Sequence, residues 1–361
     1  MTSLPRSLQP VAGPSAWKPT DFAHDDAWCY PLAEHQVAQV LQAARAWAGR
    51  DFRTLSPAET RERLSSLVPL ADALAADLAT RGFALVRGVP VDALPQEDVG
   101  LVYWAIGQLL GTGLSQNAKA DFLCPVTDMG VDFGYSGAAS QRNVRGYQSR
   151  ADLNYHCDPT DVVGLLCLRQ AKAGGASTIV STPAIFNEML ATHPEHLAVL
   201  LRGFAYDRKG EEASGEASVT PVIPVFAPHG DRVSCRYARS YILGGAQKRG
   251  VALTPAEAAA LDCFDAIARR EDMAFKMSFR QGDIQLLNNF TVVHGRTAYE
   301  DDPDPARRRF LYRLWLQLGD RTPWRDEGEA MRWAFARFGR LGRTVDEIEA
   351  MEAGQSATPA H

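Results

Sequence analysis

The sequence predicts a mainly β protein, a sandwich or barrel of short strands decorated by helices, with a helix-rich N-terminal region. From about residue 144 onward, short apolar segments alternate with long connections, as in all-β cores that carry insertions. Val162–Leu168 (VVGLLCL) is apolar at both parities, as expected of a strand covered on both faces. The first third instead carries apolar residues at helical intervals.

Three helices and one strand are expected in this N-terminal third. Apolar residues recur with helical spacing over 35–48, Pro57–Thr80 and 95–110. Ser56 is a suitable N-cap for the second helix, because its hydroxyl can accept a hydrogen bond from the first turn. Phe83–Val86 follows that helix as a short buried strand. Residues 1–30 show no period and are expected to form an irregular arm.

The remaining chain is expected to supply most of the sheet. Further strands are expected at Thr178–Ser181, Arg232–Tyr237, Ala274–Phe279, Ile284–Leu287 and Phe310–Leu318. Two helices interrupt them, at 183–194 and 255–270, and Thr254 with Glu257 forms a capping box for the second.

No repeat or long linker divides the chain, so one domain is expected over 1–361. Its parts are an arm and helices over 1–80, a β core over 81–320, and a C-terminal helix and tail over 321–361.

Composition limits the classes of function. Of the 361 residues 46% are hydrophobic and 22% charged, which excludes disorder and coiled coil for the bulk of the chain. A net charge of -5 disfavours nucleic acid and anionic membranes as partners. The six cysteines form no Cys-x-x-Cys pair, and no segment reads as a signal peptide or membrane span. These features favour a cytoplasmic protein with a small-molecule partner; whether it forms a homo-oligomer stays open.

His156 and Asp158 are the first candidates for chemistry. In an extended chain, residues i and i+2 project to the same face, so this imidazole and carboxylate could reach one metal ion while Cys157 points away. The spacing alone is common by chance. His294, at the end of the apolar segment Thr291–Val293, is a second candidate. An isolated histidine at a strand end is more often structural than a ligand.

An arginine-rich strand changes the balance. In Arg307–Leu316, alternation places Arg309, Leu311, Arg313 and Trp315 on one face. A guanidinium among large apolar residues is costly to bury unless it meets an anion, and its planar fork suits a carboxylate. Arg313 could therefore bind a ligand carboxylate or pair with an internal acid. Two histidines and one carboxylate form the facial triad of non-haem Fe(II) oxygenases.

The order His156-x-Asp158, His294, Arg313 resembles the taurine dioxygenase (TauD/TfdA) family of Fe(II)- and 2-oxoglutarate-dependent oxygenases, which includes clavaminate-synthase-like proteins. Arg81–Gly88, Gly174–Thr178 and Asn289–Tyr299 are similar to further segments of that family. The resemblance spans roughly residues 80–318. It implies a double-stranded β-helix core of the jelly-roll or cupin-like type.

The resemblance also implies residue roles. His156, Asp158 and His294 would bind iron, and Arg313 would bind the distal carboxylate of 2-oxoglutarate. A hydroxyl after a Gly-Gly pair would lie near that carboxylate; Ser177 fits the spacing better than its neighbour Thr178. Arg309 would be a second arginine that touches the keto acid or the substrate.

The implied reaction is dioxygenation with O2, which releases succinate and CO2. Halogenating relatives lack the carboxylate ligand, so Asp158 points to hydroxylation, desaturation or cyclisation. Candidate substrate residues lie in polar and basic clusters that favour a small polar metabolite, an anionic one included. They are Tyr147, Arg145, Arg239 and Asn117.

Two other classes of function are weighed against this one. The first is a barrel that binds metal and small molecules without turnover. Such a protein would be expected to have lost one of the three metal ligands or Arg313. A zinc hydrolase would use the same three ligands but would leave Arg313 without a purpose and lacks an evident general base.

Overall fold

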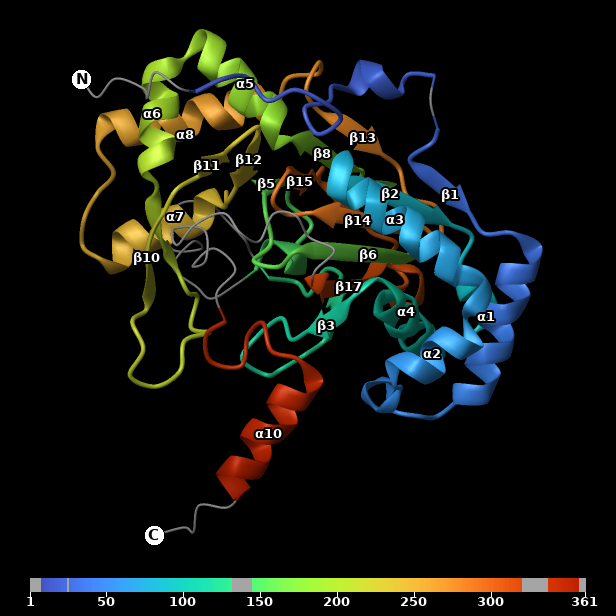
Figure 1. Ribbon diagram of the computed structural model, residues 1–361. Helices are drawn as coiled ribbons and strands as arrows, with labels where there is room; N and C mark the ends of the chain where they lie inside the picture. The colour runs from blue at the N-terminus through green and yellow to red at the C-terminus, as the bar shows by residue number, and fades with distance from the viewer. Residues whose placement is uncertain (1–7, 25, 132–144, 320–336, 357–361) are drawn as a thin grey trace.

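The fold consists of two β-sheets with helices on both sides, seen in a computed structural model that describes residues 8–24, 26–131, 145–319 and 337–356 (Figure 1). The larger sheet has seven strands, in the order β1-β2-β14-β6-β17-β3 with β4 also pairing β17. Their bounds are β1 Cys29–Pro31, β2 Phe83–Arg87, β3 Thr112–Leu114, β4 Leu123–Val126, β6 Val162–Arg169, β14 Ile284–Asn288 and β17 Phe310–Gln317.

The smaller sheet has the order β13-β8-β15-β5 and carries the candidate histidines. Its strands are β5 Leu153–His156, β8 Ser177–Ser181, β13 Phe275–Met277 and β15 Val292–Arg296. All pairings in the two sheets are antiparallel except that of β1 with β2. Three two-stranded pairs complete the β structure: β7 Ala173–Gly174 with β16 Tyr299–Glu300, β9 Phe204–Asp207 with β10 Val219–Ile223, and β11 Phe226–His229 with β12 Arg232–Cys235.

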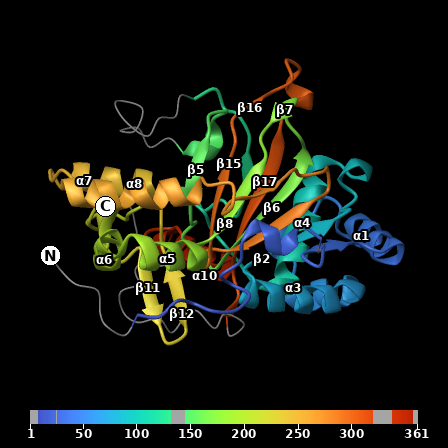
Figure 2. The ribbon, with the colours of Figure 1, turned by 90° about the horizontal axis from the view of Figure 1, so that it is seen from above.

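The helices form two groups with the sheets between them (Figure 2). The N-terminal group is α1 Glu34–Trp47, α2 Pro57–Arg63, α3 Val68–Thr80 and α4 Gln96–Leu110. The second group is α5 Thr182–Thr192, α6 Pro194–Arg202, α7 Arg239–Lys248 and α8 Pro255–Ala268. Helix α10, Val345–Ser356, lies in the part of the chain for which a C-terminal helix and tail are expected. Most of the expected tail, and residues 320–336 before the helix, lie outside the described residues.

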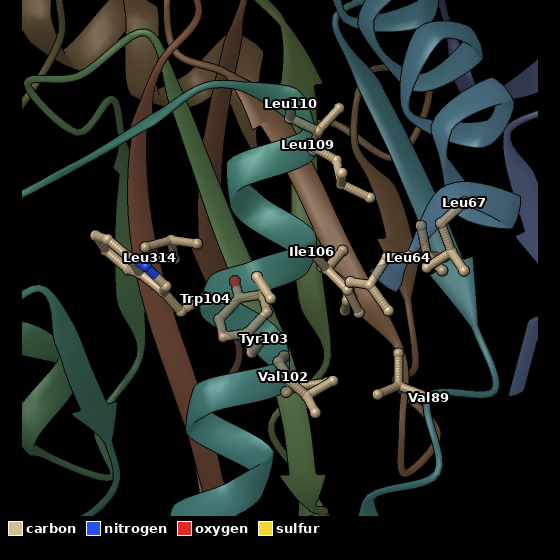
Figure 3. Close-up of a cluster of buried hydrophobic side chains, with 14 of the residues drawn as sticks. Leu64, Leu67, Val89, Val102, Tyr103, Trp104, Ile106, Leu109, Leu110 and Leu314 are labelled. Carbon is tan, nitrogen blue, oxygen red and sulfur yellow. The ribbon is translucent and has the colours of Figure 1, made fainter. Parts of the chain in front are cut away.

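Helix α4 supplies the main contact between the N-terminal helices and the larger sheet (Figure 3). Eleven of its residues are buried. Tyr103, Trp104 and Ile106 belong to a hydrophobic cluster that also contains Leu314 and Leu316 of β17. This cluster supports the back of β17, whose other face lines the candidate site.

The expectation of a mainly β core with helical decoration is confirmed, with local corrections. The helix expected over Pro57–Thr80 is two helices joined by a 3-10 turn at Ser65–Leu67. Pro69 explains the break, because it lacks an N–H and its ring clashes with the carbonyl four residues earlier. The capping box of Thr254 with Glu257 is present at α8. Helices α6 and α7 were not expected. Among the described residues, no helix is long and apolar enough to cross a bilayer.

Candidate metal centre and its pocket

The smaller sheet brings the two candidate histidines together. Antiparallel pairing of β5 with β15 sets His156 opposite His294, and their ring centroids lie 4.3 Å apart. Asp158 lies two residues after the end of β5, and its backbone N–H donates a 2.8 Å hydrogen bond to Oδ1 of Asn289. Ligand atoms of His156, Asp158 and His294 all lie within 4.8 Å of one another. This is the convergence that one metal ion needs.

Hydrogen bonding and burial prepare these side chains for a metal. Nδ1 of His156 lies 2.9 Å from the carbonyl oxygen of Asn154, an arrangement in which Nδ1–H donates and Nε2 stays available. Nδ1 of His294 is buried and has no hydrogen-bond partner among the described residues. Two imidazoles with free nitrogens beside a carboxylate suit a divalent transition metal.

Electrostatics favours the protonation states that bind metal. Burial alone would raise the pKa of Asp158, but Arg313 and the two histidines lower it to about 2. Burial, assisted by His156, lowers the pKa of His294 to about 3, and burial also lowers the pKa of His156. At neutral pH the centre therefore offers an ionised carboxylate and two neutral imidazoles. Few protons then compete with the metal.

Arg313 is buried beside the metal centre and already has partners. Its Nε donates a 2.7 Å hydrogen bond to Oε1 of Gln116, and its Nη1 lies 3.5 Å from Oδ2 of Asp158. The guanidinium carbon also lies 4.4 Å from the ring centroid of Tyr147 and 5.1 Å from that of Trp315.

Arg309, just before β17, is equally buried but less satisfied. Its guanidinium carbon lies 5.1 Å from the ring centroid of Tyr299, and its Nη1 has no hydrogen-bond partner among the described residues. Burial lowers the pKa of Arg309, because its interactions with Tyr299, Cys167 and Asp301 offset only part of the cost of keeping this cation out of water. The expected alternation holds, because Arg309, Leu311, Arg313 and Trp315 all line one cavity.

The structure separates the two hydroxyls that compete in the sequence. Ser177 lines the cavity and donates a 2.9 Å hydrogen bond to Oε1 of Gln285. Thr178 pairs with Gly295 of β15 and is not among the cavity-lining residues. Cys157 also lies as expected: its Sγ is 3.8 Å from the carbonyl oxygen of Cys235, within a buried cluster.

All four candidate substrate residues line the cavity, whose volume is about 460 Å³. Arg145 contacts the Tyr241 hydroxyl and the Glu211 carboxylate.

The other polar candidates already have partners. Arg239 donates hydrogen bonds to Asp265 at 2.8 Å and to Asp262 at 2.6 Å, so its charge is compensated. Asn117 donates to Asp121 at 2.9 Å. Among the described residues the lining holds nine Lys or Arg and four Asp or Glu.

Sequence reasoning missed several residues of this cavity, among them Lys209, Glu211 and Trp315. Lys209 and Glu211 lie after β9, in a segment with no motif that marks it as functional. Lys209 has a φ of +56°, a left-handed conformation uncommon for a residue other than glycine. Trp315 could have been found, because strand alternation already set it on the face of Arg313.

Comparison with known proteins agrees with this geometry. The family model described as "Taurine catabolism dioxygenase TauD, TfdA family" matches residues 51–315. The chain belongs to this family. FR-33289 synthase of Streptomyces rubellomurinus is 32% identical over 333 residues, which cover 90% of this chain and 95% of that protein. The taurine hydroxylase-like protein SAT17 of Stachybotrys chartarum is 26% identical and covers 86% of this chain and 80% of its own length.

Solved structures confirm the jelly-roll oxygenase fold. An asparagine oxygenase, solved with Fe(II), hydroxyasparagine and succinate, aligns with a TM-score of 0.62 and 16% identity over 81% of this chain and 94% of its own. The non-haem iron oxygenase OrfP, solved with Fe and α-ketoglutaric acid, gives a TM-score of 0.59 and 16% identity over 87% of this chain and all of its own. The family assignment makes this chain an Fe(II)- and 2-oxoglutarate-dependent dioxygenase that uses O2.

Proposed function

We propose that this dioxygenase hydroxylates a small anionic substrate at an iron centre held by His156, Asp158 and His294. The observation that carries the proposal is that this triad lines the same cavity as Arg309, whose Nη1 has no hydrogen-bond partner among the described residues. Bound iron, with 2-oxoglutarate and O2, supplies the oxidising chemistry. The chain's own residues hold the metal, orient the keto acid and position the substrate.

In this proposal Arg309 and Arg313 bind different anions, one the keto acid and the other the substrate. The sequence assigns the distal carboxylate of 2-oxoglutarate to Arg313, but the contacts support Arg309 for that role. Arg313 is already bonded to Gln116 and lies beside Asp158, whereas Nη1 of Arg309 needs an acceptor. Ser177 lines the same cavity and can support the carboxylate. Arg313, stacked on Tyr147, would then face the substrate.

The charge of the cavity supports an anionic substrate. The chain carries a net charge of -5, yet among the described residues the lining has nine basic and four acidic side chains. Arg145 and Lys209 both lie against the Tyr241 ring, at 5.6 Å from guanidinium carbon or Nζ to ring centroid. Arg145 is paired with Glu211, whereas Lys209 shares the single carboxylate of Asp207 with Lys248, so one positive charge there has no counter-ion among these groups. We assign Lys209, with Arg313, to the anionic part of the substrate.

Glu211, which contacts Arg145 at the same end of the cavity, indicates that the substrate also carries a hydrogen-bond donor. One carboxylate oxygen contacts Arg145, while its Oε2 is buried and has no hydrogen-bond partner among the described residues. Arg145 neutralises the charge of Glu211, so a neutral N–H or O–H donor satisfies Oε2 without a second cation. The proposed substrate therefore carries such a donor besides its anionic group.

A substrate-dependent succinate assay tests the proposal. The enzyme is incubated with Fe(II), 2-oxoglutarate and O2, and each member of a panel of amino acids, sulfonates, aryl acids, phosphate esters and phosphonates. We expect succinate, and a product 16 Da heavier than the substrate, only with anionic compounds. Products lighter by 2 Da would indicate desaturation or cyclisation. A preference for cationic or apolar compounds would contradict the substrate assignment.

The non-catalytic alternative has no observation in its favour, because all the groups that the reaction needs are present. We also retain one catalytic domain and a cytoplasmic location as proposals. The latter is supported by six cysteines that are all free.

A further inference from the structure

Trp315 contacts the metal centre but has no role in the function proposed so far. It lies on β17 two residues after Arg313 and is 3% exposed. Its indole Nε1–H donates a 2.9 Å hydrogen bond to Oδ2 of Asp158, which is itself 5% exposed. A buried hydrogen bond to an ionised carboxylate is among the stronger kinds and strongly favours one orientation.

The two oxygens of Asp158 consequently have different surroundings. Oδ2 accepts from Trp315 and faces Nη1 of Arg313 at 3.5 Å. Oδ1 lies on the side of the histidines, 3.8 Å from Nε2 of His156. The side chain is thus oriented with one oxygen toward the metal position and the other turned to the indole.

We propose that Trp315 is a positioning residue that holds Asp158 with Oδ1 toward the metal. This inference rests on the metal centre of the proposed function. A ligand carboxylate without such a donor can rotate, or bind through both oxygens and occupy a position that the keto acid or O2 needs. Partners of metal ligands typically change metal affinity 10- to 100-fold when they are removed.

Arg313 does not make the indole redundant. Its distance to Oδ2 is longer than that of the indole, and its Nε is committed to Gln116. The indole is also rigid, because Trp315 is packed in a hydrophobic cluster with Leu114, Val163 and Leu287. A fixed donor at 2.9 Å determines the carboxylate orientation better than a guanidinium on a flexible stem.

The test compares Trp315→Phe with Trp17→Phe. Trp17 is a matched control: it is also 3% exposed, belongs to the same cluster, and its Nε1–H donates a 2.8 Å hydrogen bond, but to the backbone carbonyl of Arg81. Both substitutions remove the same atoms and one indole hydrogen bond, which is buried at Trp315 and partly buried at Trp17. Electron paramagnetic resonance of free Mn(II) measures the dissociation constant of the metal, with neither 2-oxoglutarate nor substrate present.

We expect Trp315→Phe to weaken Mn(II) binding by 10- to 100-fold, and Trp17→Phe to change it by less than about threefold. Equal affinities for all three proteins, or equal losses in both variants, would overturn the inference. Wild-type protein that binds no Mn(II) would instead refute the metal centre itself. If Trp315→Phe does not fold, 3-benzothienylalanine at position 315 replaces the N–H by sulfur at nearly constant volume. The same loss of affinity is then expected, and an unchanged affinity would refute the inference.

Discussion

Arg309, just before β17, and Arg313, on β17, lie four residues apart and face the same cavity, yet they differ in what they contact. Strand alternation predicts from the sequence that both face the same cavity. Their partners could not be predicted, because Gln116 and Tyr147, which contact Arg313, lie more than 160 residues earlier in the chain. The same holds for the triad, since its residue types and order suggest a metal, whereas the opposition of His156 to His294 depends on sheet register.

Alanine substitutions separate the roles of the two arginines. Arg309→Ala removes the proposed partner of a buried carboxylate, which costs about 2–5 kcal/mol and weakens 2-oxoglutarate binding by roughly 30-fold or more. Arg313→Ala is expected to leave that dissociation constant within a few fold and to raise the KM for the substrate. Anaerobic titration of the Fe(II) protein with 2-oxoglutarate measures the first effect, and the succinate assay measures the second. If Arg313→Ala instead weakened 2-oxoglutarate binding and Arg309→Ala did not, Arg313 would be the residue that binds the keto acid.

At the scale of elements, the sequence was informative where one residue pattern dominated. Strands with apolar residues on both faces, such as β6 and β17, and the capped helix α8 were predicted within a few residues. The prediction of one continuous helix over 57–80 was wrong, because apolar residues keep their helical spacing across Pro69. Helix α7, Arg239–Lys248, was missed because its two adjacent glycines and weak periodicity hid it, and its packing on β9 depends on the tertiary fold.

The spacing between α4 and the larger sheet gives a test at this scale. Gly111 follows α4 in an extended conformation, and a Cβ there would lie 2.4 Å from the backbone oxygen of Gln317 on β17. Because backbone cannot move aside as a flexible side chain can, Gly111→Ala is expected to lower the free energy of unfolding by about 1–3 kcal/mol.

Gly354→Ala is the control for that substitution, since nothing lies within 4 Å of its Cβ position on α10. It is expected to leave stability unchanged or to raise it by up to about 1 kcal/mol through helix propensity. Urea unfolding measures both variants. If the two variants were equally stable, the close approach of Gly111 to β17 would not exist in the protein.

At the scale of the whole molecule, charge is separated between the surface and the cavity. The net charge of -5 disfavours nucleic acid as a partner but gives no hint of a basic cavity. Among the described residues, the basic side chains of the lining come from segments spread from Lys119 to Arg313, so only the folded chain gathers them. Such a cavity attracts small anions into a protein that otherwise repels them.

The central claim is that His156, Asp158 and His294 hold iron in a cavity that also binds 2-oxoglutarate. Anaerobic addition of Fe(II) and then 2-oxoglutarate, followed by visible absorption, tests it most directly. We predict a weak charge-transfer band that requires both components, saturates at one Fe(II) per chain, and is lost in His294→Ala. No band in the wild-type protein, or an unchanged band in His294→Ala, would contradict the account.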